Sequence, residues 1–369
     1  MEKKTILKDL LIRVNPYYKG HSTISKFGTL VCLVFCLLLS YLGQSQTYTK
    51  AQLLEAYLKP NLHPNFYILA AHRGYWKDVG IPENSKKAYD KAGLYNYDMV
   101  EIDIMKSSDG IVFCFHDWIL DRLTNGEGIV KKDYNTTLVT YEAIKNFTLK
   151  DRYENVVDGE HIPTLEEILT LLRDKYPNIL ISLDKVNTCF QEAYNVAKKV
   201  NVLDRVFIKG TYNSGTPFIK TPNDLKNQFT SQEAKDWAVG HYTPILFSNN
   251  IPTDFKSDLD LWISSGVASF EIVYKTDSDP LLQPRTDLGN INTVEYVKSK
   301  NKRAGMFVEW PDNCNGTWNS PQSVYKIPDF PNDRRNDWDW VLPKGTNYII
   351  ADRVEKLMDL LQAIGKRTY

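Results

Sequence analysis

The chain lacks a surplus of either charge. Among its 369 residues, Lys and Arg together number 45, and so do Asp and Glu. A basic surplus is the electrostatic signature of nucleic-acid-binding proteins, and this balance gives no reason to expect a nucleic acid as partner. Hydrophobic residues make up 43% and charged residues 24%, which excludes a disordered or collagen-like chain. The length allows one large α/β barrel or two ordinary domains.

Cysteine is also scarce, with five residues in all. Two of them, Cys32 and Cys36, fall in an N-terminal leader, and Cys114, Cys189 and Cys314 are far apart in the sequence. This number and spacing predict neither a disulfide framework nor a Cys-based metal site. We expect the last three to be small buried apolar residues, with a single bridge as the alternative.

The first 45 residues predict a signal peptide. Six basic residues precede an apolar run from Leu30 to Leu42, and Gly43-Gln44-Ser45 offers small residues for cleavage between Ser45 and Gln46. An exported protein, periplasmic or extracellular, would result, and 39 basic and 43 acidic side chains would remain, a net charge of −4. The alternative is an uncleaved membrane anchor, because the segment from Phe27 to Gly43 approaches the roughly 17 to 25 residues that span a bilayer.

Eight short β-rich runs follow, separated mostly by amphipathic segments. Strand alternating with helix implies parallel pairing, and eight such units predict a TIM-type (β/α)8 barrel. An open doubly wound sheet is the alternative, but no glycine-rich phosphate loop follows the first run. The runs are Tyr67–Ala71, Met99–Met105, Ile179–Asp184, Arg205–Lys209, Thr243–Phe247, Ala268–Tyr274, Ala304–Trp310 and Tyr348–Asp352.

The domain organisation follows from this pattern. Residues 46–65 are expected to form an N-terminal linker or helix, and residues 66–369 a single barrel domain. Two segments without a long apolar run, 118–163 and 311–331, are expected as a loop-rich insertion and a loop on the rim. Four helices are predicted at Ser85–Tyr95, Thr164–Tyr176, Phe190–Val200 and Val354–Ile364.

The second predicted strand carries two carboxylates on one face. Strand alternation separates Glu101 and Asp103 from the apolar residues between and beside them. The apolar face must meet the helices, so both acids are expected to point into the barrel. Two buried carboxylates repel each other unless a cation neutralises them, and hard oxygen ligands suit Mg²⁺ or Ca²⁺. The alternative is a structural ion pair with Lys or Arg.

A hairpin arm is expected directly after this strand. The turn Ser107-Ser108-Asp109-Gly110 is too short for a crossover, so the next run must return antiparallel. A two-residue loop at Ser108-Asp109 would place His116 opposite Glu101, and one at Asp109-Gly110 would place it opposite Asp103. Either register predicts that His116 shares the face of the two acids.

Further polar residues end two other predicted strands. Asp184 and Lys185 end the third run, where a barrel holds metal ligands or catalytic groups. His72 and Arg73 end the first run, and they offer a proton-exchanging group and a planar fork for phosphate. Asn84 is expected as the cap of the following helix.

These pieces together resemble the glycerophosphodiester phosphodiesterase family, within the phospholipase-C-like phosphodiesterase barrels. The resemblance spans roughly residues 67 to 365, with the pieces in order and at comparable spacing. One departure is that Asp184 directly precedes Lys185, whereas many members have a Glu two residues before a Lys. The matching pieces are His72-Arg73-Gly74, Pro82-Glu83-Asn84-Ser85, Glu101-Ile102-Asp103, Asp109-Gly110, His116-Asp117, Asp121-Arg122-Leu123-Thr124, Gly126-Glu127-Gly128, Ile162–Glu167 and Ile350-Ala351-Asp352-Arg353.

The resemblance implies a function and a set of roles. The reaction would be the metal-dependent hydrolysis of glycerophosphodiesters to glycerol phosphate and an alcohol. By resemblance, His72 and His116 correspond to the general acid and base. The ligands of one divalent cation, Mg²⁺ or Ca²⁺, correspond to Glu101, Asp103 and Asp184. The phosphate contacts correspond to Arg73 and Lys185.

Two other functions remain open from the sequence. A phospholipase acting on intact lipids or lysophospholipids could use tryptophans near strand ends, Trp310 among them, for headgroup binding or contact with a membrane surface. Packing of the rim is the alternative role of these tryptophans. A non-catalytic binding module on the same barrel is the other function, because fold does not fix function.

Overall fold

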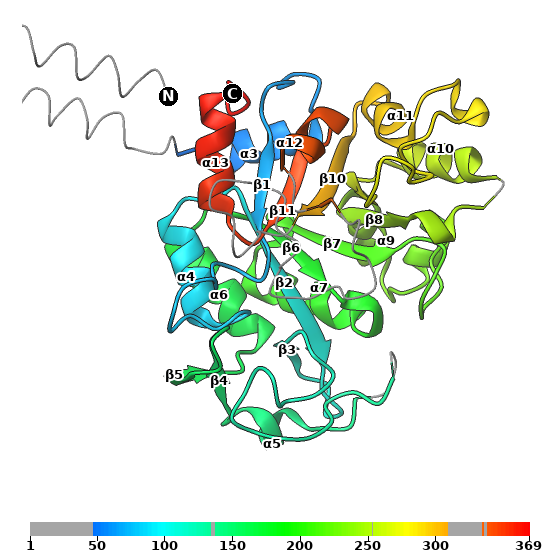
Figure 1. Cartoon of the computed structure of the whole chain (residues 1–369). Helices are drawn as coiled ribbons and strands as arrows, with labels where there is room; N and C mark the ends of the chain where they lie inside the picture. The colour runs from blue at the N-terminus through cyan, green and yellow to red at the C-terminus, as the bar shows by residue number, and fades with distance from the viewer. Residues whose placement is uncertain (1–46, 134–136, 253, 309–333, 336–337) are drawn as a thin grey trace, which may run out of the picture. The chain divides into compact units, whose positions relative to one another are not determined.

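Eight parallel strands form a closed barrel in the computed structural model, which describes residues 47–369 apart from 134–136, 253, 309–333 and 336–337 (Figure 1). Each strand pairs with the next along the chain, and β1 closes the ring by pairing with both β2 and β11. The predicted barrel is therefore confirmed, and every observed strand end lies within two residues of its predicted position. The strands are β1 Ile68–Ala71, β2 Met99–Lys106, β6 Leu180–Asp184, β7 Val206–Thr211, β8 Tyr242–Phe247, β9 Ser269–Val273, β10 Arg303–Val308 and β11 Tyr348–Ala351.

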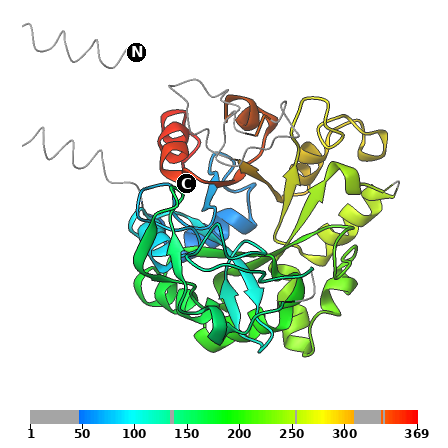
Figure 2. The same ribbon diagram turned by 60° about the horizontal axis from the view of Figure 1, so that its bottom comes forward.

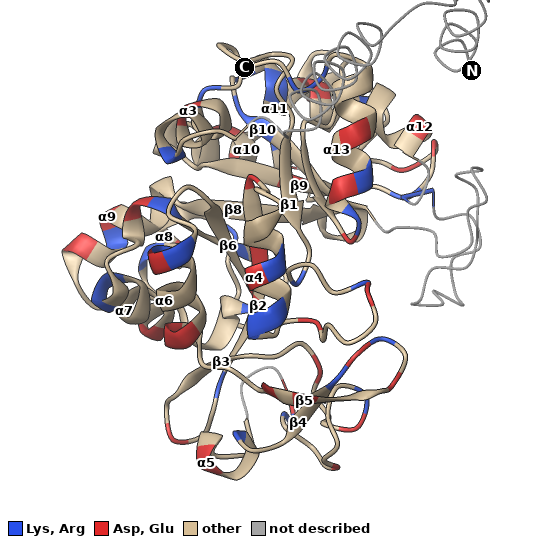
Figure 3. Cartoon of the chain, turned by 90° about the vertical axis from the view of Figure 1, so that its left-hand side faces the viewer, with Lys and Arg blue, Asp and Glu red and all other residues tan. Residues whose placement is uncertain are grey.

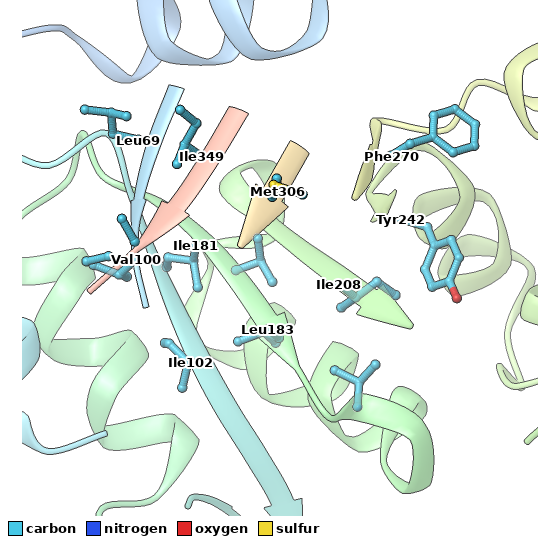
Figure 4. Packing of buried hydrophobic residues seen from close by; sticks show 14 of the residues in the cluster. Leu69, Val100, Ile102, Ile181, Leu183, Ile208, Tyr242, Phe270, Met306 and Ile349 are labelled. Carbon is cyan, nitrogen blue, oxygen red and sulfur yellow. The ribbon is translucent and has the colours of Figure 1, made fainter. Parts of the chain in front are cut away.

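Helices surround the ring of strands, as the tilted view in Figure 2 shows. They pack on the outward side chains of the strands, including Val100, Ile102, Ile181 and Ile349, in one continuous apolar layer (Figure 4). Lys, Arg, Asp and Glu lie on the outer helices such as α4, α7 and α9 (Figure 3). The helices are α4 Lys86–Leu94, α6 Leu165–Lys175, α7 Phe190–Val200, α8 Pro222–Lys226, α9 Gln232–Gly240, α10 Phe255–Ser265, α11 Thr293–Ser299, α12 Trp338–Val341 and α13 Val354–Ala363.

Shorter features complete the described chain. None of its helices is long and apolar enough to span a membrane. Cys114 and Cys189 are buried free thiols, while Cys314 and the leader lie outside the described residues. The 3-10 helices are Val186–Thr188, Leu203–Arg205, Ser248–Asn250, Thr286–Leu288 and Leu342–Lys344.

Helix α3, Lys50–Leu58, closes the barrel at the amino ends of its strands. A capping box starts it: the Thr49 hydroxyl accepts the backbone N–H of Gln52, and the Gln52 side chain accepts that of Thr49. Tyr57 is buried against inward-facing residues of the strands, among them Phe207 and Tyr348. The segment expected as a linker or helix is thus a helix that forms the floor of the barrel.

The hairpin arm is present, but both predicted registers are wrong. Strand β3, Val112–Cys114, pairs with β2 so that Ile104 lies opposite Cys114. The connection has three residues, because Ser107 N–H bonds to Ile111 O at 2.9 Å and Gly110 adopts a φ of 87°. A turn followed by a left-handed glycine is the usual three-residue hairpin loop. This register would carry His116 away from the two acids if β3 continued, but the strand ends at Cys114.

The rim insertion contains more regular structure than expected. It holds helix α5, Tyr141–Ile144, and a two-stranded sheet of β4, Thr148–Lys150, and β5, Val156–His161. These elements lie together at the lower edge of Figure 1. A separate apolar cluster holds them to the arm, and it consists mainly of Met105, Phe113, Phe115, Leu120, Leu123, Val130, Ile144, Leu149 and Ile162. Strands of three residues are too short to produce a readable sequence pattern.

The floor of the barrel depends on one buried cation. Arg303 is fully buried, and its guanidinium donates hydrogen bonds to the carbonyls of Ala56, Phe66 and Asn347. Burial lowers the pKa of Arg303 to about 9. The side chain therefore joins the end of α3 to β1 and β11.

We expect Arg303→Met to lower the free energy of unfolding by about 3 kcal/mol or more, because each buried acceptor left without a donor costs about 1–3 kcal/mol. Urea denaturation measures this change. Lys300→Met, at an exposed position three residues before Arg303, is the matched control. Equal stability of the two variants would contradict the anchoring role of Arg303.

Candidate active site

A cavity of about 250 Å³ lies at the carboxyl ends of the strands. One wall is apolar and includes Ile245, Phe247 and Phe307. The other is charged and contains His72, Arg73, Glu101, Asp184, Lys209 and Glu271. Barrel enzymes place their active sites at this end. Four of the eight residues predicted for the site line this cavity: His72, Arg73, Glu101 and Asp184. Asp103 and Lys185 each contact one of these four, and Trp310 lies outside the described residues.

The turn after β1 fixes the position of His72. Arg73 and Gly74 both have positive φ, 57° and 79°, so the chain reverses sharply at the strand end. A Cβ on Gly74 would lie 2.9 Å from the Cβ of Ala88, which only glycine avoids. The Trp76 indole donates to the His72 carbonyl at 3.0 Å. This buried tryptophan therefore supports the turn.

The His72 ring is held by the carboxylate of Asp352. Nδ1 lies 2.7 Å from Asp352 Oδ1, and Lys77 Nζ is 3.0 Å from the other oxygen. Burial alone would raise the pKa of Asp352, but Lys77 and His72 lower it, so this carboxyl is ionised and can only accept. Nδ1 is then the donor, and Nε2 keeps a lone pair that accepts from Arg73 Nε at 3.2 Å.

Arg73 connects His72 to two carboxylates. Its Nη1 donates to Glu83 Oε1 at 2.7 Å, and its Nε is 3.2 Å from Asp103 Oδ2. Burial would raise the pKa of Glu83, but the guanidinium groups of Arg73 and Arg122 lower it to about 2. Glu83 is thus a permanent anion that orients the fork of Arg73.

Asn84 is part of this network and does not cap α4. The cap is Ser85, whose hydroxyl accepts the N–H of Ala88. Asn84 instead donates to Asp103 Oδ2 at 2.9 Å and accepts the Asp103 N–H at 3.1 Å. Its φ of 54° turns the side chain out of the capping position, and a single sequence cannot distinguish adjacent capping residues. The expectation for Asn84 was wrong.

His116 lies just beyond β3 and is held from two sides. Its Nδ1 is 2.6 Å from Asp117 Oδ1, and its carbonyl accepts from Lys185 Nζ at 2.7 Å. Burial lowers the pKa of His116, and Arg73 lowers it further. Burial would raise the pKa of Asp103, whereas His116 and Arg73 lower it. The His116 ring therefore lies near Asp103, as expected. The bend of the chain after Cys114 places the ring there, whereas the pairing register of β2 and β3 does not.

Sequence reasoning missed the buried cation at the centre of the barrel. Lys209 Nζ lies 2.7 Å from Glu101 Oε1, 3.0 Å from Glu271 Oε2 and 3.3 Å from Asp184 Oδ2. Lys209 and Glu271 occupy inward positions of β7 and β9, beside the outward residues Ile208 and Phe270. The strand alternation that identified Glu101 and Asp103 would also have identified Lys209 and Glu271.

The acids of β2 and β6 can still hold a metal ion. Asp103 pairs in register with Asp184, and Glu101 lies two residues earlier on the same inward face. Glu101 Oε2 is buried and has no hydrogen-bond partner among the described residues. Burial raises the pKa of Glu101 despite Lys209 and His72. A hard divalent cation suits these carboxylates, and it would share them with the Lys209 ammonium.

A different group of potential ligands lies closer together. Atoms of Glu83, His116 and Asp117 all fall within 4.8 Å of one another. Arg122 already neutralises this group, because its guanidinium contacts both Glu83 and Asp117. We therefore interpret it as an ion-pair network that positions His116.

Known proteins are similar to part of this chain. Residues 72–246 match the model of the Glycerophosphoryl diester phosphodiesterase family. The match includes His72, His116, Glu101, Asp103 and Asp184, and the resemblance noted in the sequence is confirmed.

Two curated relatives illustrate the similarity. The glycerophosphodiester phosphodiesterase of Caldanaerobacter subterraneus is 39% identical over 108 residues, which cover 29% of this chain and 41% of that protein. The putative glycerophosphodiester phosphodiesterase YhdW of Bacillus subtilis is 38% identical over 117 residues, covering 32% and 44%. The similar segments thus span less than half of either relative.

Solved structures share the fold. A glycerophosphoryl diester phosphodiesterase from Parabacteroides distasonis aligns with a TM-score of 0.58 and 18% identity, covering 86% of this chain and 93% of that one. A putative member from Silicibacter pomeroyi aligns with a TM-score of 0.57 and 12% identity, covering 85% and 98%. At these identities the likeness concerns the barrel alone.

We expect Lys209→Met to destabilise the metal-free protein by about 3–5 kcal/mol, because it leaves buried carboxylates without their counter-charge. A divalent cation should then bind more tightly and restore much of the loss. Thermal unfolding with chelator and with Mg²⁺ or Ca²⁺ measures both effects. Lys356→Met, at an exposed position on α13, is the control. If the melting temperature of Lys209→Met did not rise on addition of the cation, the result would contradict a metal site at these acids.

Proposed function

We propose that the protein hydrolyses glycerophosphodiesters to glycerol phosphate and an alcohol, as a phosphoric diester hydrolase. The observation that carries the proposal is the pair of histidines. Each is fixed through Nδ1 by an ionised carboxylate, His72 by Asp352 and His116 by Asp117, and both lie by Asp103 and Arg73. Two oriented imidazoles beside carboxylates and cations suit proton transfer to and from a bound phosphodiester.

The cations of the site would hold the phosphate. Arg73 presents a planar guanidinium, and the Lys185 ammonium reaches over from the end of β6. The carboxylates of Glu101, Asp103 and Asp184 would hold one divalent cation, Mg²⁺ or Ca²⁺. When bound, such a cation polarises a phosphoryl oxygen and offsets negative charge that grows in the transition state.

The hydrogen bonds favour distinct roles for the two histidines. Nε2 of His72 directs its lone pair toward Arg73, so this nitrogen can accept a proton. We therefore assign His72 as the base that removes a proton from the attacking hydroxyl. His116 lies on the side of Lys185, and we assign it as the acid that protonates the departing alkoxide.

Replacing either histidine should lower kcat by about 10² to 10⁴, the usual contribution of a positioned proton-transfer group. The double variant should lose far less than the product, because groups that act as a unit are not additive. Release of glycerol phosphate from glycerophosphoethanolamine, by His72→Ala and His116→Ala, measures this. The exposed His161, changed to Ala, is the control.

A substrate with an activated leaving group separates the two roles. Such a leaving group needs no acid, so activity should return in His116→Ala and stay low in His72→Ala. Recovery in the His72 variant alone would reverse the assignment. A fall in melting temperature with unchanged kcat would mean that the histidines are structural.

We also propose that the protein is exported after cleavage between Ser45 and Gln46. The proposal rests on the basic head and apolar run of the first 45 residues. The mature protein should begin at Gln46 and be recovered outside the cytoplasm, and intact-mass measurement tests this. A mature species that keeps residues 1–42 would instead support the anchored form.

A further inference from the structure

A second pocket lies beside the candidate active site, on the side of His116. Its volume is about 250 Å³, and Met105, Trp118, Lys131, Lys185 and Asn187 line it. Lys185 belongs to both regions, because its ammonium donates to the carbonyl of His116 at 2.7 Å. The pocket therefore begins where a group leaving the phosphate toward His116 would be found.

Local backbone structure fixes Lys131 at this pocket. Its N–H donates to the Trp118 carbonyl at 3.1 Å, and the residue forms a β-bridge with Thr137. The side chain extends over Trp118, with Nζ 5.9 Å from the centre of the ring. Lys131 is 8% exposed, so its ammonium is mostly withdrawn from water without being sealed off.

The charged side chains that line the pocket are positive. Two ammonium groups line it, and no carboxylate does so among the described residues. Burial lowers the pKa of Lys131, Lys185 lowers it further, and Asp133 opposes them from outside the lining. An anion bound between these two ammonium groups would accept charge-assisted hydrogen bonds from both. Such bonds are stronger where the groups are partly removed from water.

The rest of the lining suits a short carbon chain. The Trp118 ring and the Met105 side chain offer apolar surface, and the Asn187 amide offers polar contacts. A quaternary or primary ammonium group would meet two like charges here. The same pocket would therefore disfavour a head group that is only cationic.

We propose that this pocket receives the leaving alcohol and selects an alcohol that carries its own carboxylate, with Lys131 as the specificity-determining residue. The inference rests on the proposed hydrolysis of glycerophosphodiesters and specifies its substrate class. Lys185 would contribute from the phosphate side, whereas Lys131 contacts only the leaving group.

Glycerophosphoserine and glycerophosphoethanolamine form a matched pair for the test, because they differ by one carboxylate. The wild-type protein should show a kcat/KM about tenfold or more higher for the serine diester, the range expected for one charged hydrogen bond. Lys131→Met should abolish that preference: kcat/KM for the serine diester should fall about tenfold, whereas that for the ethanolamine diester should not fall, because its ammonium then meets one like charge fewer.

Two further variants complete the design. Lys131→Arg keeps the charge and should keep the preference, and Lys132→Met removes an exposed neighbouring charge and should change nothing. Equal efficiency of the wild-type protein on both diesters, or an unchanged preference in Lys131→Met, would overturn the assignment of the pocket alone. Hydrolysis of neither diester would overturn the proposed function and this assignment with it.

Discussion

The mutual repulsion of carboxylates inside the barrel is the constraint on which the site depends. Glu101, Asp103, Asp184 and Glu271 all project from strands into the interior, where charge is poorly solvated. The ammonium of Lys209 joins three of them, and Arg73 contacts the fourth. The strands can carry this acidic layer because a cation is part of the folded chain.

Arg73 and a further set of carboxylates orient the two histidines of the proposed chemistry. Arg73 contacts His72, Glu83 and Asp103, so a change at any one of these groups alters the direction of the guanidinium. Asp352 and Asp117 hold the far sides of the two imidazoles. The geometry of the proton-transfer groups is thus set by carboxylates that need not touch substrate. Such fixed orientation is what a catalytic site needs before substrate arrives.

Much of the fold could be predicted because periodicity is a strong signal in this chain. Each of the eight strands coincides within two residues with a short β-rich run of the sequence, and α7 was predicted at its observed bounds, Phe190–Val200. The hairpin register could not be predicted, because it depends on whether Gly110 adopts a left-handed conformation. The three-residue strand β4 gave no signal at all.

The candidate site was harder to predict than the barrel. Motif residues such as His72 and Glu101 stand out by type, whereas Lys209 looks like an ordinary lysine until its strand is aligned with the others. The pairing of Asn84 with Asp103 joins two elements through a side chain, which no local pattern encodes. Contacts of this kind are set by the closure of the barrel.

The floor made by α3 has a consequence for how the site exchanges material with its surroundings. Tyr57 and Arg303 are buried at the amino ends of the strands, so the described side chains fill that end of the barrel. Diester, water and both products would then pass through the other end of the barrel, at the carboxyl ends of the strands where the cavity lies. A released alcohol in the pocket of Trp118 and Lys131 would lie beside that route. Either product could then leave first without being blocked by the other.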